Sequence, residues 1–183
     1  RLANEVLYFS NVFATGTRTV RGLEALTLSV PPTTGQSIFR RPKNENLNTL
    51  QSYFKNAAYT TEFIYGGYSY FDNMNSFFVN NDMKVWDRAN IDKSKVTFSN
   101  AWGVCDENLY DLAIERADES FKAGKNFFQL VLTTSNHRPY TYPQKIDIPS
   151  GTGRDGAVKY SDFAIGEFIK NSRSKKWFKD TIF

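Results

Sequence analysis

Short apolar segments typical of strands alternate along this chain with segments whose apolar residues recur at helical spacing, and this alternation restricts the possible folds. The strand-like segments are 7–13, 60–65, 84–86 and 127–133. Repeated strand–helix–strand units imply a mostly parallel sheet with helices on both faces. The sequence therefore predicts an α/β fold with a three-layer sandwich.

Helices are expected between these strands, with start and stop signals in the sequence. The first covers 18–30 and ends at Pro31-Pro32, before a polar loop over 31–46. The others cover 47–57 with Asn46 as N-cap, 106–124 with Asp106 as cap, and 155–171. The run 127–133 is the most apolar, which is typical of a strand buried on both faces, and residues 181–183 resemble the start of another strand.

Composition narrows the class of protein. The chain has 183 residues, of which 40% are hydrophobic, which is enough for one domain with a sizeable core. No window approaches the roughly 18 consecutive apolar residues of a membrane span. The single Cys105 excludes an internal disulfide framework and a multi-cysteine zinc site. A net charge of +4 favours anionic partners, but without a basic stripe it does not favour nucleic acid.

Three polar clusters follow predicted strands, at 15–19, 66–72 and 135–137. Parallel sheets bind ligands at the carboxyl ends of their strands. We therefore expect the three clusters to form a single site.

The first cluster lies in Ala14-Thr-Gly-Thr-Arg-Thr-Val-Arg-Gly22, at the start of a predicted helix. A hydroxyl of Thr17 or Thr19 there would lie among unpaired backbone N–H groups, and Arg18 and Arg21 could pair with phosphate oxygens. The alternative is that Thr17 is simply an N-cap. Spacing alone leaves both interpretations open.

The other two clusters contribute His137 and Asp72. His137 is the only histidine, in a polar loop after the apolar strand, where it could donate to a phosphoryl oxygen or move a proton. Asp72 follows Gly66-Gly67 among aromatic residues and could accept hydrogen bonds from hydroxyls. Each also has a purely structural interpretation, as a surface histidine and as part of an aromatic loop packed on the core.

Several motifs together resemble the lipoteichoic acid synthase family, within the alkaline phosphatase and sulfatase superfamily. They are Ala14–Glu24 (ATGTRTVRGLE), Phe63–Gly67 (FIYGG) with Phe71–Met74 (FDNM), Trp102–Glu107 (WGVCDE) and Thr134–Tyr140 (TSNHRPY). Their order and spacing span nearly the whole chain. The resemblance implies an alkaline phosphatase-like fold and transfer of phosphoglycerol, or a related phosphoalcohol, through a phospho-threonine intermediate.

The resemblance also implies roles for particular residues. The family's nucleophile, a threonine that binds a divalent metal, matches Thr19, and its substrate-binding histidine matches His137. Asp72 and Arg21 are expected to help bind substrate. Mn²⁺ is the expected metal, with Zn²⁺, Mg²⁺ or Ca²⁺ as alternatives. The family's other metal ligands, an upstream Glu and a downstream Asp-His pair, have no match, so residues 1–183 are expected to form a single partial catalytic domain.

The resemblance further implies a phospholipid head group as donor and a glycan or polymer as acceptor. It implies a periplasmic location, with membrane association through segments not in this chain. The segment Tyr70–Met74 lacks the Trp and Arg of Gram-positive synthases, which favours the Gram-negative branch. The alternatives are a phosphoethanolamine transferase, a phosphodiesterase or a sulfatase-like hydrolase of the same superfamily, and a non-catalytic anion- or glycan-binding module.

Overall fold

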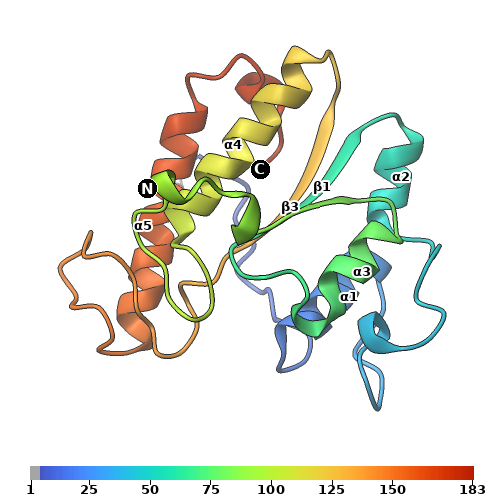
Figure 1. The fold of residues 1–183 in the computed structure, drawn as a ribbon, viewed down its shortest axis with the longest axis horizontal. Helices are drawn as coiled ribbons and strands as arrows, with labels where there is room; N and C mark the ends of the chain where they lie inside the picture. The colour runs from blue at the N-terminus through green and yellow to red at the C-terminus, as the bar shows by residue number, and fades with distance from the viewer. Residues whose placement is uncertain (1–4) are drawn as a thin grey trace.

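A three-stranded parallel sheet in the order β2–β1–β3 forms the centre of the molecule (Figure 1), in a computed structural model that describes residues 5–183. The strands are β1 (Thr60–Tyr65), β2 (Lys84–Trp86) and β3 (Phe127–Leu132). The helices are α1 (Thr19–Leu28), α2 (Leu50–Asn56), α3 (Met74–Val79), α4 (Asp106–Lys122) and α5 (Arg154–Ser172). Both strand pairs are parallel, which confirms the predicted α/β class.

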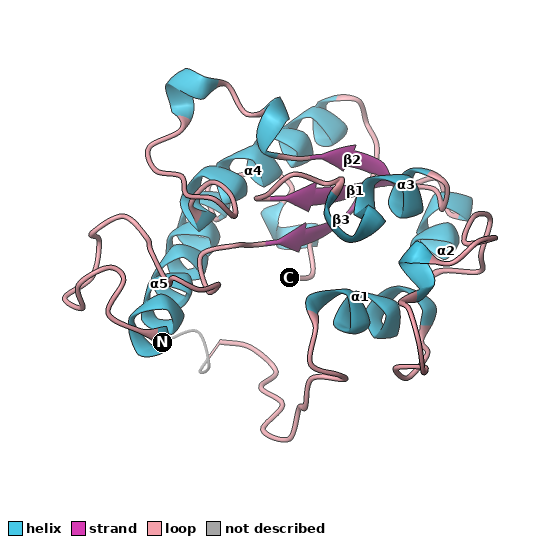
Figure 2. Ribbon diagram, turned by 60° about the horizontal axis from the view of Figure 1, so that its bottom comes forward, coloured by secondary structure: helices cyan, strands magenta, loops and turns pink. Residues whose placement is uncertain are grey.

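Helices cover both faces of the sheet, with α4 and α5 on one side and α1, α2 and α3 on the other (Figures 1 and 2). Alternate side chains of β1 enter the two layers, because successive strand residues point to opposite faces. Phe63 and Tyr65 join a core with α1 and α3, whereas Ile64 packs against α4. The three predicted layers are therefore present, and β1 is the strand buried on both faces.

The predicted helices are present, but several of their caps differ. Arg18, and not Thr17, is the N-cap of α1, and its side chain makes no capping hydrogen bond. Thr49, and not Asn46, caps α2 through a capping box with Ser52. Asparagine is a favoured N-cap residue, but Asn46 has a positive φ of 55° and lies outside the helix. Residue type alone was therefore not sufficient to predict the N-cap.

The strand expected at 7–13 was wrong, because residues 7–18 are irregular. Its apolar side chains are exposed, with Phe13 at 86%. An extended segment is stable as a strand only when a neighbour satisfies its backbone groups, and no described strand pairs with this one. Residues 181–183 are also not a strand, and Ile182 is fully exposed.

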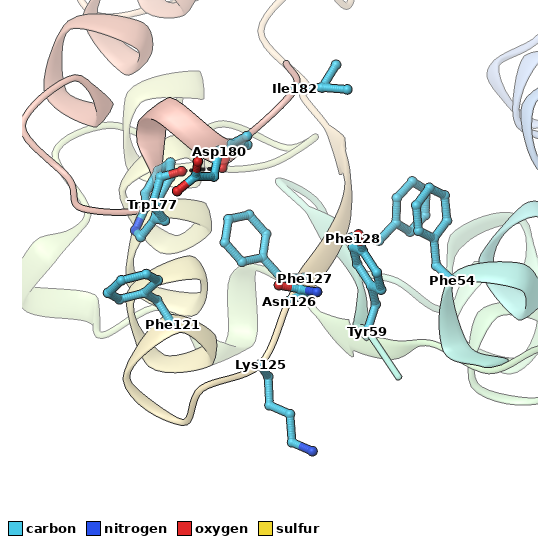
Figure 3. A pocket seen from close by; sticks show the side chains of 11 residues that line it. Phe54, Tyr59, Phe121, Lys125, Asn126, Phe127, Phe128, Trp177, Asp180 and Ile182 are labelled. Atoms are coloured by element: carbon cyan, nitrogen blue, oxygen red, sulfur yellow. Dashed lines mark hydrogen bonds between the residues drawn. The ribbon is translucent and has the colours of Figure 1, made fainter. Parts of the chain in front are cut away.

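β3 forms one edge of the described sheet, and its predicted burial on both faces is incomplete, although its side chains pack against core clusters on both faces. All of its residues are only partly buried. A cavity of about 450 Å³ lies beside its first residues (Figure 3). Phe127 packs there against Trp177, and Phe128 stacks on Phe54. This cavity contains none of the predicted site residues, so it marks the free strand edge and not the predicted site.

Glycines bring three loops together at the carboxyl ends of β1 and β3. A Cβ on Gly103 would lie 2.2 Å from the Gly66 carbonyl oxygen, and one on Gly67 would lie 2.6 Å from the Trp102 carbonyl oxygen. The Val104 N–H donates to the Gly66 carbonyl at 2.9 Å. The segment before α4 is therefore fixed directly against the end of β1.

Within residues 5–183, we find no helix that combines the length and apolar character needed to cross a membrane.

We predict that Gly103→Ala destabilises the protein by about 1–3 kcal/mol or more, because the new methyl group meets backbone that cannot move away cheaply. Gly166→Ala is the matched control, since a Cβ at that position in α5 meets nothing within 4 Å and alanine favours a helix. Urea unfolding of both variants measures the difference. Equal stabilities would show that this close approach is not a constraint.

Candidate active site

A pocket of about 140 Å³ lies at the carboxyl ends of β1 and β3. Three of the four predicted site residues line it: Thr19 from the start of α1, Asp72 from the loop after β1, and His137 from the loop after β3. The other lining residues are Val20, Tyr65, Phe71, Met74, Trp102, Leu132, Thr133, Thr134 and Asn136. The structure therefore brings residues 118 positions apart, Thr19 and His137, into one pocket.

Thr19 is the first residue of α1, and it is exposed. No side chain caps this helix, and among the described residues the N–H groups of Thr19 and Val20 have no backbone partner. Free N–H groups and the helix dipole both favour an anion at a helix N-terminus. The Thr19 hydroxyl thus lies where a phosphoryl oxygen would be stabilised.

His137 is exposed and packs on Trp102, with 3.6 Å between the ring centroids and 34° between the ring planes. Its Nδ1 lies 3.0 Å from the Arg138 carbonyl oxygen. A carbonyl only accepts hydrogen bonds, so this contact assigns the proton of the neutral ring to Nδ1. Nε2 is then left to accept a proton or, when the ring is protonated, to donate to an oxyanion.

Asp72 lines the pocket wall, and its side chain is only 9% exposed. Its backbone has a φ of 50°, and Asn73 follows with a φ of 61°. Tyr65 is buried beside it, and its pKa is raised by burial and further by the negative charges of Asp72 and Asp87. The Tyr65 phenol therefore stays protonated at neutral pH.

Arg21, the fourth predicted residue, does not line the pocket. Its guanidinium donates to Glu24 Oε2 at 3.0 Å and to the Gly35 carbonyl at 2.5 Å. Glu24 is fully buried and also accepts from the Ile38 N–H at 2.5 Å. Arg21 is thus engaged in fixing the loop after α1, away from Thr19, Asp72 and His137.

Asp106 positions the loop that carries His137 and is not the helix cap that we predicted. Cys105 is the N-cap of α4, and Asp106 is its fully buried first residue. The carboxylate accepts from the Ser135 N–H at 3.1 Å and from the Ser161 hydroxyl at 3.1 Å. A buried carboxylate requires such partners, so the loop after β3 is held to both α4 and α5.

The described residues do not build a metal site. No group of three or more His, Cys, Asp and Glu side chains within residues 5–183 could hold a metal ion. Thr19 offers one oxygen, whereas divalent metals need several convergent ligands. The donor set present in this part of the chain therefore does not fit the expected metal.

Sequence reasoning missed Trp102, Tyr65 and Arg40 as parts of the site region. Trp102 entered the sequence analysis only as the first residue of the motif Trp102–Glu107, although the adjacent Gly103 marks a close backbone approach. Tyr65 ends β1 and faces the pocket, which its place in the alternation of the strand could have indicated. Arg40 lies 32 residues before Asp72 and forms an ion pair with it, for which the sequence carries no local signal.

Comparison with known proteins bears on the family and the fold of the chain. The sulfatase family model matches residues 1–183. Phosphoglycerol transferase I of Xanthomonas campestris pv. campestris (strain B100) is 28% identical over 206 residues, covering 100% of this chain and 28% of that protein. Phosphoglycerol transferase I of Salmonella arizonae is 28% identical over 143 residues, covering 73% of this chain and 19% of that protein.

Two solved structures share the fold. One, a protein in the alkaline phosphatase superfamily from Vibrio parahaemolyticus, has a TM-score of 0.85 and 38% identity over 92% of this chain and 42% of that chain. The other, the lipoteichoic acid synthase LtaP from Listeria monocytogenes, has a TM-score of 0.75 and 22% identity over 87% of this chain and 41% of that chain. The chain thus spans less than half the length of the relatives that it matches.

We predict that Trp102→Ala moves the imidazole proton signals of His137 downfield, because the indole ring that packs against the imidazole shields them now. His137 is the only histidine, so its signals need no assignment. Trp86→Phe is the control, since Trp86 lies on β2 and outside the pocket. Unchanged His137 signals in Trp102→Ala would show that the two rings do not pack together in solution.

Proposed function

The chain belongs to the sulfatase family, and on that premise we propose that it carries the nucleophile of a phosphoglycerol-type transferase. The observation that most supports this is the shared pocket of Thr19, Asp72 and His137 at the N-terminus of α1. The names of the phosphoglycerol transferase relatives support the chemical class. Because the chain covers 28% of the first of these, the activity of the whole protein is part of the proposal.

The proposed reaction has two displacements at phosphorus. In the first, Thr19 Oγ attacks the phosphodiester of a lipid head group; the O–P bond to threonine forms and the P–O bond to the lipid alcohol breaks, and the alcohol leaves with a proton. In the second, an acceptor hydroxyl attacks the phospho-threonine; the bond from phosphorus to the acceptor oxygen forms, the P–O bond to Thr19 breaks, and the acceptor's proton passes to Thr19 Oγ. Water as the acceptor would give hydrolysis. A covalent intermediate divides one difficult step into two easier ones.

The residues of the pocket have distinct tasks in this scheme. The free N–H groups at the start of α1 stabilise the charge that develops on the phosphoryl oxygens. His137, in its protonated form, orients these oxygens by donating a hydrogen bond from Nε2, since its Nδ1 is engaged with the Arg138 carbonyl. Asp72, as an acceptor in the pocket wall, binds a hydroxyl of the glycerol group.

We also propose a metal, membrane and cell-envelope context. The superfamily generally uses a divalent metal, and we propose Mn²⁺, with Thr19 as one ligand and the rest supplied by segments outside residues 1–183. Those segments would also attach the enzyme to the membrane at its periplasmic face. The donor would be a phospholipid head group, and the acceptor a glycan or polymer.

Thr19→Ala is expected to lower turnover by roughly 10³-fold or more in the full-length enzyme with Mn²⁺ present, because no other group replaces the nucleophile. Loss of labelled glycerol phosphate from the lipid donor measures turnover, and the intact mass of quenched enzyme detects the covalent adduct. Thr17→Ala is the control, since Thr17 precedes the helix and does not line the pocket. Normal activity of Thr19→Ala would rule out the proposed function.

Calorimetric titration of Mn²⁺ into the 183-residue chain is expected to detect no tight site, because its described residues contain no cluster of ligands. Tight binding by this chain alone would contradict the proposal that the remaining ligands lie elsewhere. Absence of Mn²⁺ binding in the full-length protein as well would instead favour a non-catalytic anion- or glycan-binding module.

A further inference from the structure

Two arginines from separate elements approach one carboxylate at the pocket wall. Arg18 Nη2 lies 3.7 Å from Asp72 Oδ1, and Arg40 Nη1 lies 3.8 Å from the same oxygen. The side chain of Asp72 is 9% exposed, whereas those of Arg18 and Arg40 are 65% and 56% exposed. The cluster therefore has one unit of excess positive charge, and its two guanidiniums face solvent.

The backbone around this cluster is held firmly. Asp72 and Asn73 both have positive φ values, 50° and 61°, which are uncommon for residues other than glycine and persist where the surroundings enforce them. Asn73 Nδ2 donates to the Phe39 carbonyl at 2.6 Å, and the Phe39 ring is fully buried against Phe77. Arg40 directly follows Phe39, so the backbone of Arg40 is fixed in position relative to Asp72.

The hydrogen-bond donors of these two guanidiniums are not used. Within residues 5–183 neither Arg18 nor Arg40 donates a side-chain hydrogen bond, and 3.7–3.8 Å is too long for one. Arg41, by contrast, donates to the carbonyls of Gln36 and Thr34 and to the Thr33 hydroxyl. Arg41 is thus structural, whereas the other two arginines keep their full capacity for an oxyanion.

We propose that Arg18 and Arg40 form a phosphate-binding pair at the mouth of the Thr19 pocket. Asp72 is their internal counterion when no ligand is bound. Guanidinium groups match the oxygens of phosphate in pairs, and Arg18 immediately precedes Thr19 at the N-terminus of α1. The pair recognises a phosphate ester, either soluble or as a lipid head group. This inference rests on the proposed function for the substrate class.

Calorimetric titration of glycerol phosphate into the full-length protein tests whether Arg18 and Arg40 bind phosphate. Each of Arg18→Ala and Arg40→Ala is expected to weaken binding about tenfold, and the double variant more, because a charge-assisted hydrogen bond is lost in each case. Lys43→Ala is the control, since it removes the same charge from an exposed residue near Arg40. A double variant that binds as tightly as Lys43→Ala would overturn the proposal.

Asp72→Asn tests the counterion with inorganic phosphate as the probe, which has no glycerol hydroxyl. The variant is expected to bind phosphate several-fold more tightly, since a competing negative charge is removed. Asparagine tolerates the positive φ at this position, and the His137 signals and the urea midpoint verify the fold. Weaker binding of phosphate by a folded Asp72→Asn variant would overturn the counterion role.

Phosphatidylglycerol in detergent micelles distinguishes the two sources of phosphate. If the ligand is a lipid head group, these micelles displace labelled glycerol phosphate from the full-length protein in detergent, phosphatidylcholine micelles do not, and Arg18→Ala/Arg40→Ala loses this displacement. If it is a soluble ester, only the calorimetric affinity changes. Thr19→Ala separates this inference from the proposed function, because it is expected to lose turnover and keep phosphate affinity. Loss of turnover in Thr19→Ala with unchanged affinity in the arginine variants would overturn this inference alone.

Discussion

The candidate site depends on the close backbone approach of Gly66 and Gly103 at the carboxyl end of β1. The Gly66 carbonyl accepts from the Val104 N–H at 2.9 Å, and the Gly66 N–H donates to the Leu132 carbonyl at 3.0 Å. Thr134 Oγ then donates to the Val104 carbonyl at 3.1 Å. Gly66 thus helps to connect the loops that carry Asp72, Trp102 and His137. A side chain at Gly103 would collide with the Gly66 carbonyl and separate these three loops.

Buried carboxylates extend this framework away from the pocket. Asp106 holds the loop of His137 through the Ser135 N–H, and Glu62 on β1 accepts from Trp86 Nε1 at 2.8 Å and from Gln129 Nε2 at 3.1 Å. Each of these charges is paired, as burial requires. The buried carboxylates of Asp106 and Glu62 are therefore structural, whereas the exposed Thr19 and His137 remain available to a substrate.

Hydrophobic periodicity in the sequence predicted helices and strands well where tertiary packing agrees with local propensity. β1 and β2 have the predicted bounds, and α1, α4 and α5 lie within a few residues of theirs. Patterns failed where the outcome depends on neighbours. The apolar segment 7–13 has the composition of a strand, but in the described part of the chain no strand pairs with it. β3 is as apolar as a central strand, yet it lies at the edge of the described sheet.

The sequence by itself determined the α/β class and the two loops after β1 and β3 that carry Asp72 and His137. Period-2 and period-3.6 patterns depend only on local geometry, so they are readable without a structure. Tertiary structure alone decided that Arg18 and Arg40 meet Asp72. Such pairings join residues far apart in the chain, and only the packing of α1 and the 3-10 turn Ile38–Arg40 against the loop after β1 selects among the available charges.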